Sequence, residues 1–145
     1  MPATQTTVSA SCVIPGFRYR DAPAAIEWLC NVFGFEKKAV YEGENGTIGH
    51  AELTLGGGMV MLGTGKDDEF SRGFKAPTEL GGIQTASAYI VVPDADAAHA
   101  RAVAAGATIV RPLQDTPYKS REFTVMDGEG HTWTAGTYDP WAANG

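Results

Sequence analysis

The sequence lacks the features that would place it in a membrane, on nucleic acid or in a disulfide scaffold. Its 145 residues include only two cysteines, Cys12 and Cys30, which form neither a metal motif nor a disulfide framework. No stretch reaches the roughly 18 consecutive apolar residues of a membrane span. Lys and Arg number 11 against 17 Asp and Glu. This acidic chain has no basic run, which argues against nucleic acid as a partner.

The N-terminal segment does not look like a signal peptide, because residues 1–11 have neither the basic region nor the apolar region of one. We therefore expect a mobile tail on a cytoplasmic protein. Apolar residues make up 43% of the chain, which is enough for the core of one compact domain. The formal charge of −6 weakly favours cationic ligands over anionic ones.

Two parts of the chain share one pattern. The segments RYRDAPAAIEWLCNVFGF and VVPDADAAHARAVAAGAT both continue an apolar strand with an aspartate, an Ala-rich helix and a closing glycine. Asp21 and Asp94 are suited to cap these helices, and they are 73 residues apart. The strand–turn–strand segments TLGGGMVML and VMDGEGHTWTAG share this offset, which matches Met61 with Thr134. The repeat predicts an α+β fold made of two β-α-β-β-β modules.

The boundaries of the modules follow from the same repeat. We place the first module at residues 12–63, the second at 86–141 and a short C-terminal tail at 142–145. Residues 64–85 join the modules. This linker is polar and glycine-rich, and it is long for a plain connection. We expect it to cover a ligand or to reach a partner.

Four segments carry a resemblance to a known family: DAPAAIEWLCNVFGFE, GHAELTLGGGMVML, VVPDADAAHARAVAAGATIVRP and PYKSREFTVMDGEGHTWTAGTYDPW. They resemble the vicinal oxygen chelate superfamily over about residues 13–141. This group includes glyoxalase I, extradiol dioxygenases, fosfomycin resistance proteins and bleomycin-binding proteins. The resemblance implies that the two modules form a cupped mixed sheet with the helices on its convex side. It also implies a homodimer, because the family commonly closes the cup with a second chain.

The metal enzymes of this superfamily carry ligands on the first and last strand of each module. The corresponding residues here are Ile14, Met61, Ser87 and Thr134. A hard divalent cation needs carboxylates, imidazoles or carbonyls, which this set does not supply. The resemblance therefore implies the scaffold without its metal, and we expect no metal and no other cofactor. We expect His131, in the turn DGEGH, to be structural.

Alternation along the strands assigns one face to the helices and the other to the cup. Tyr19 and Trp133 are expected on the helix face. Arg18 lies in an apolar strand and needs a partner, for which Glu52, Glu122 or a ligand anion are candidates. The candidate ligand-binding residues of the cup are Arg18, His50, Glu52, Met59, Met61, Tyr89, Glu122 and Thr134.

His50 and Glu52 form the best chemical pair, because alternate residues of a strand lie about 7 Å apart on one face. Histidine titrates near neutrality and can do acid–base work, although a polar ladder at a sheet rim or dimer contact is the simpler interpretation. The cup favours a metal-independent protein that sequesters a cationic or amphipathic small molecule. The alternative is an isomerase, epimerase or lyase that acts on a small carbonyl compound through His50 and Glu52, with or without a metal. A third interpretation is a regulatory subunit without a ligand, with the linker and TYDPW as contact surfaces.

Overall fold

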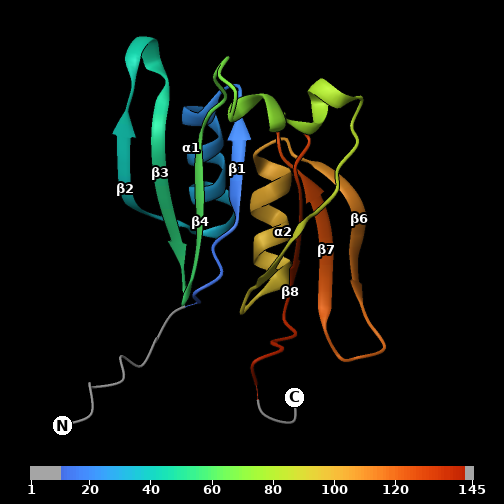
Figure 1. The fold of residues 1–145 in the computed structure, drawn as a ribbon. Helices are drawn as coiled ribbons and strands as arrows, with labels where there is room; N and C mark the ends of the chain where they lie inside the picture. Colours follow the sequence, from blue (N-terminus) through green and yellow to red (C-terminus); the bar gives the residue numbers. More distant parts are fainter. Residues whose placement is uncertain (1–10, 143–145) are drawn as a thin grey trace, which may run out of the picture.

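The structure is a computed structural model that describes residues 11–142 (Figure 1). The first module comprises β1 (Gly16–Tyr19), α1 (Ala22–Phe33), β2 (Glu36–Glu42), β3 (Ile48–Leu55) and β4 (Gly58–Thr64). The second comprises β5 (Ala88–Val91), α2 (Ala95–Ala104), β6 (Thr108–Asp115), β7 (Arg121–Met126) and β8 (Thr132–Gly136). The predicted α+β fold of two β-α-β-β-β modules is confirmed. The tails predicted at 1–11 and 142–145 lie outside the described residues, except for Ser11 and Ala142.

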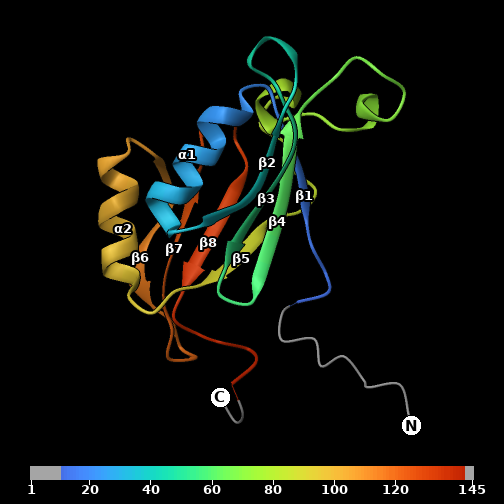
Figure 2. The same ribbon diagram turned by 90° about the vertical axis from the view of Figure 1, so that its left-hand side faces the viewer.

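Each module forms its own four-stranded mixed sheet. The strand orders are β1-β4-β3-β2 and β5-β8-β7-β6, and in each sheet only the first strand runs parallel to its neighbour. Strand pairing within residues 11–142 does not join β1 to β5, so the sheet stays in two halves. The halves lie side by side in Figure 1, and Figure 2 shows both helices on the same side of the molecule. No helix of the described chain is long and apolar enough to cross a membrane.

The register of the strands confirms the repeat. Gly16 of β1 pairs with Met61 of β4, and Tyr89 of β5 pairs with Thr134 of β8. Both partners in the second module are therefore displaced by 73 residues (89 − 16 and 134 − 61). The offset is 72 on the third strand of each module, because Met61 pairs with residue 52 while Thr134 pairs with residue 124.

The helices begin where the sequence places their caps. The Oδ1 atom of Asp21 accepts a hydrogen bond from the Ala24 N–H at 3.1 Å, and that of Asp94 accepts from the Ala97 N–H at 3.0 Å. These carboxylates satisfy N–H groups that have no partner inside the helix. Both predicted N-caps are therefore confirmed, and each helix packs one face on its own sheet.

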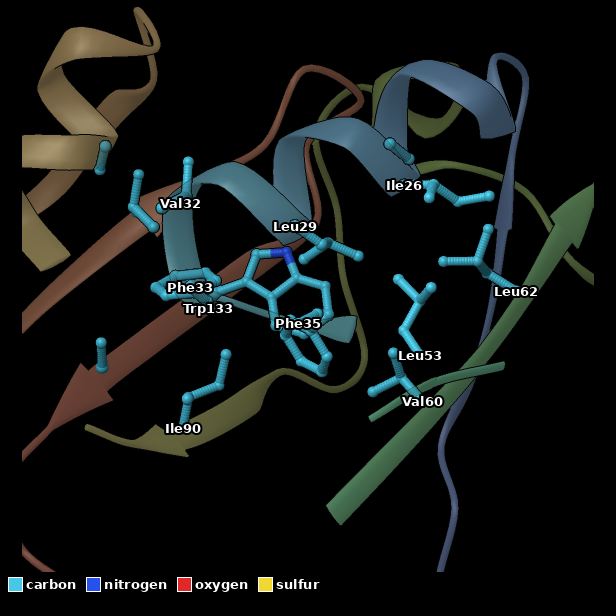
Figure 3. Close-up of a cluster of buried hydrophobic side chains, with 14 of the residues drawn as sticks. Ile26, Leu29, Val32, Phe33, Phe35, Leu53, Val60, Leu62, Ile90 and Trp133 are labelled. Carbon is cyan, nitrogen blue, oxygen red and sulfur yellow. The ribbon is translucent and has the colours of Figure 1, made fainter. Parts of the chain in front are cut away.

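Trp133 joins the cores of the two modules. It comes from β8 and is fully buried. Its ring lies 5.1 Å from that of Phe17 and 6.3 Å from those of Phe33 and Phe35, all in the first module. Figure 3 shows Trp133 beneath α1, next to Phe33 and Phe35. The helix-facing sides of both sheets thus share one core, and the expected place of Trp133 in it is confirmed.

The turn between β7 and β8 is a second junction between the modules. Asp127 is buried, and its Oδ2 atom accepts from the Tyr19 hydroxyl at 2.7 Å and the Trp133 indole N–H at 3.0 Å. Its Oδ1 atom accepts from the backbone N–H groups of Glu129 at 3.0 Å and His131 at 3.1 Å. One carboxylate therefore organises its own turn and holds the end of β1.

The same turn reaches two further segments. The carboxylate of Glu129 accepts from the N–H groups of Arg20 at 2.6 Å and Asp21 at 2.8 Å, and its carbonyl accepts from the Thr78 N–H at 3.1 Å. Gly130 adopts a left-handed φ of 89°, and a Cβ there would lie 3.0 Å from the side chain of Pro77. The linker therefore packs directly on this turn and is part of the folded structure.

His131 closes this junction. Its Nε2 atom lies 3.1 Å from the carbonyl oxygen of Arg18, and its ring packs edge-on against Phe17 and Tyr19. These contacts agree with the structural role expected for this histidine.

Candidate functional site

The side chains predicted to line the cup alternate with buried ones along their strands. Ala51 and Leu53 on β3 and Val60 and Leu62 on β4 are buried towards the helices. The predicted cup residues between them, and those on β1, β5 and β8, are more exposed. Glu122 is the exception, because it is only 6% exposed although it lies on the face of β7 opposite Phe123.

The first module contributes a polar pair to this open face. The Nε2 atom of His50 lies 3.0 Å from Oε2 of Glu52, and their side chains are 41% and 28% exposed. The ring of Tyr41 stacks on the imidazole at 6.1 Å. Glu52 is also the register partner of Met61 on β4. The pair can therefore offer a hydrogen bond or a proton to a ligand that lies over the two strands.

Arg18 has a different partner from those expected. Its guanidinium carbon lies 5.4 Å from the ring centre of Phe70 and 5.6 Å from that of Phe74, both in the linker. Within residues 11–142 it forms no salt bridge with Glu52 or Glu122. Cation–π contacts with two linker phenylalanines thus replace the predicted ion pair.

The second module buries the carboxylate of Glu122 under tyrosines. Its Oε1 atom accepts from the Tyr118 hydroxyl at 2.7 Å. Its Oε2 atom lies 3.4 Å from the hydroxyl of Tyr89, which is also 2.8 Å from the Tyr138 carbonyl. A hydroxyl has a single proton to donate, and the shorter contact takes it. One oxygen of this buried carboxylate is therefore left with only a long contact.

Two tyrosine hydroxyls contact this carboxylate, and the ring of a third tyrosine packs against one of the two. The side chains of Tyr89, Tyr118 and Tyr138 are all exposed, and the last two meet edge-to-face with 5.7 Å between their ring centres. The hydrogen bond to the Glu122 carboxylate raises the pKa of Tyr118. Burial raises the pKa of Tyr89, and the negative charge of Glu122 adds to this rise. Both phenols are therefore neutral donors at physiological pH.

Gly136 allows these groups to come together. It lies on β8 opposite Glu122 of β7. A Cβ at this position would lie 2.7 Å from Cγ of Glu122 and would also collide with the Tyr89 hydroxyl. The absence of a side chain on β8 thus leaves the space in which Tyr89 approaches Glu122.

Sequence reasoning found Tyr89 and Glu122 but missed Tyr118 and Tyr138. Both missed residues lie outside the strands, one in the β6–β7 turn and one after β8, so alternation could not assign them to a face. The only available signal was that Tyr118, in the β6–β7 turn, lies four residues before Glu122, close enough in sequence for the two side chains to meet. By the offset of 72, Glu122 occupies the place that His50 has in the first module.

The positions that carry the metal in related enzymes do not fit a metal here. Met61 lies beside Gly16 and Glu52, and Thr134 lies beside Tyr89 and Thr124, whose hydroxyl is 2.8 Å from that of Thr134. The remaining two positions, Ile14 and Ser87, add no imidazole or carboxylate. Residues 11–142 hold no cluster of three or more His, Cys, Asp or Glu that could bind a metal ion. These side chains do not provide the donor set of a divalent metal site.

The chain belongs to the Glyoxalase/Bleomycin resistance protein/Dioxygenase superfamily, whose profile matches residues 12–135. The resemblance inferred from the sequence is therefore confirmed. The chain is 33% identical to TioX from Micromonospora sp. ML1, whose crystal structure matches 88% of this chain and 98% of TioX with a TM-score of 0.66.

Two further proteins place the chain among its relatives. It is 34% identical over 116 residues to the uncharacterized protein Rv0887c of Mycobacterium tuberculosis (strain ATCC 25618 / H37Rv), covering 80% of this chain and 68% of that protein. The fosfomycin resistance protein FosX from Mesorhizobium loti matches 90% of this chain and 93% of its own with a TM-score of 0.61. At 17% identity, FosX shows a shared fold alone.

Proposed function

We propose that this protein binds a small molecule without a metal, and that the molecule is a cationic or amphipathic compound that docks over Glu122. The observation that carries this proposal is the buried carboxylate of Glu122, which has one weakly bonded oxygen and lies beside the exposed side chains of Tyr89 and Tyr118. A buried charge needs a partner, and an ammonium group would supply both the charge and the missing donor. Tyrosine faces attract the same cation.

Other residues of the open faces suit the remainder of such a ligand. Met59 and Met61 provide adaptable apolar surface on β4, and Thr134 adds a hydroxyl on β8. Small-molecule sites combine a mostly apolar wall with a few polar anchors. We also propose that the protein is a cytoplasmic homodimer in which a second copy covers these faces. Exposed Tyr41 and Trp141 are candidates for that contact.

Glu122→Gln should weaken the binding of a cationic aromatic compound by roughly ten- to a hundred-fold, because it removes the charge and keeps the size. A thermal-shift screen of cationic aromatic compounds identifies hits, and calorimetry then gives their affinities. Wild-type protein treated with a chelator should bind equally well, because the site uses no metal.

The matched control is Glu36→Gln, which removes an equal charge from an exposed position on β2. If both variants weaken binding equally, the effect is general electrostatics and the Glu122 site is wrong. Binding that disappears after chelation would contradict the metal-free mechanism.

A second candidate function rests on the contact between His50 and Glu52. Their separation of 3.0 Å suits a general base that moves a proton in an isomerase, epimerase or lyase reaction on a small carbonyl compound. The test follows deuterium exchange at the carbon next to the carbonyl of small oxo acids by NMR. If the pair is catalytic, His50→Ala and Glu52→Gln should each slow exchange by about 10²–10⁴-fold. Exchange at the buffer rate with wild-type protein would exclude this function for the compounds tested.

A further inference from the structure

A hollow of about 380 Å³ lies at the C-terminal end of β1, beside the linker. Figure 1 shows the linker crossing the end of β1. Its lining includes four cationic side chains, which are Arg18, Arg20, Lys66 and Lys75. The whole chain has only 11 Lys and Arg residues and a formal charge of −6. More than a third of its cations are thus gathered around one hollow of an acidic protein.

The cations of this hollow form no salt bridges in the described chain, residues 11–142. The carboxylate of Asp68 lies near two of them, and its pKa is lowered by hydrogen bonds from Ser71 and then by the charges of Lys66 and Arg18. The two carboxylates in the lining are bonded elsewhere, since Glu79 accepts from the Ala76 N–H at 2.9 Å and Asp67 lies 3.6 Å from Arg72. Four positive and two negative side chains leave the lining with a net charge of +2. Mutual repulsion of like charges is unfavourable unless an anion offsets it.

The linker holds one of these cations in place. The rings of Phe70 and Phe74 are 4.9 Å apart, and the guanidinium of Arg18 lies within 5.6 Å of both. The three distances place both rings on one side of the guanidinium, so its other side stays open to a planar or tetrahedral anion that its N–H groups can bind. Phe74 also lines the hollow. The aromatic pair therefore preorganises Arg18 as a donor.

We propose that this hollow binds a small organic anion with two or more negative charges, whose phosphate or carboxylate groups are held by Arg18, Arg20, Lys66 and Lys75. At least two charges are needed to neutralise the lining. The site is separate from the tyrosine cluster on the second module and does not depend on the function proposed for it. The protein would then have a cation site on the second module and an anion site between the end of β1 and the linker.

Calorimetry with inorganic pyrophosphate and with citrate tests this proposal at constant ionic strength set with NaCl. Both probes carry several charges, and their relative affinity distinguishes a phosphate site from a carboxylate site. We expect saturable binding of at least one probe. Arg20→Gln and Lys75→Gln, both at exposed positions, should each weaken it about tenfold or more. Arg18→Lys should also weaken it, because it keeps the charge and loses the planar donor edge.

The matched control is Lys38→Gln, which removes one positive charge from an exposed position on β2 outside the hollow. It should leave the affinity for the anion unchanged. Equal weakening by Lys38→Gln and Arg20→Gln would overturn the proposal, as would the absence of saturable binding of either probe. Glu122→Gln should bind the anion with the affinity of wild-type protein. The anion proposal and the cation proposal can therefore fail independently, because they are tested with different probes and different variants.

Discussion

Replacing Asp127 with alanine should lower the free energy of unfolding by about 3–5 kcal/mol. Four donors converge on this carboxylate: the Tyr19 hydroxyl, the Trp133 indole N–H and the N–H groups of Glu129 and His131. Each buried donor that loses its acceptor costs about 1–3 kcal/mol, and water entering the space left behind recovers part of the sum. Urea unfolding gives the change from the shift in midpoint at constant slope.

Two other substitutions bracket this result. Asp127→Asn keeps one acceptor oxygen and should be destabilised less than the alanine variant. Asp139→Ala removes a carboxylate whose hydrogen bond, to the Trp141 N–H at 2.9 Å, is local and exposed, so its effect should stay within about 0.5 kcal/mol. A loss below about 1 kcal/mol in Asp127→Ala would mean that the turn does not join the modules energetically.

Above about pH 10, wild-type protein should lose stability faster than Tyr19→Phe. Burial raises the pKa of Tyr19 well above its usual value, and the charge and hydrogen bond of Asp127 raise it further. In the unfolded chain the phenol ionises near pH 10. The buried, protonated phenol therefore makes its full contribution to the free energy of unfolding below pH 10. This contribution declines as the pH rises from 10 towards the pKa of Tyr19 in the folded protein. The decline amounts to about 1.4 kcal/mol for each pH unit.

The comparison with phenylalanine isolates this residue. At neutral pH, Tyr19→Phe should be less stable by about 1.5–3 kcal/mol, because the bond to the Asp127 carboxylate is lost. Urea unfolding between pH 8 and 11.5 should show that this gap narrows above pH 10. The raised pKa values of Tyr89 and Tyr118 affect both proteins alike and cancel in the difference. A constant gap across this range would contradict the buried-phenol explanation.

The fold could be predicted because local and periodic features of the sequence determine it. Asp21 and Asp94 cap helices a few residues away, and strand alternation assigned Leu53 and Trp133 to the core. The offset of 73 then related one half to the other and placed Met61 and Thr134 at equivalent strand positions. Each of these signals depends on nearby residues or on a fixed spacing, so a single sequence contains it.

The site was less predictable, because its contacts join distant residues. Tyr19 and Asp127 are 108 positions apart. The residues of the turn DGEGH do not indicate that its aspartate forms a hydrogen bond with the other module. The linker was expected to cover a ligand or partner, and neither Phe70 nor Phe74 showed a periodicity that would pair it with Arg18. Tyr118 falls in a turn, where the face that a side chain occupies depends on the turn geometry.

The β7–β8 turn also bears on how two copies of one unit diverge after a duplication. Its counterpart in the first module, Gly56–Gly57, is a two-residue turn that accepts a bond from Ser11. In the second module the longer turn supports the β1–α1 junction of the other half through Asp127 and Glu129. The two halves are therefore no longer interchangeable. A chain that contained the first half twice would lack Asp127 and Glu129, and with them the hydrogen bonds that tie the second module to Tyr19, Arg20 and Asp21.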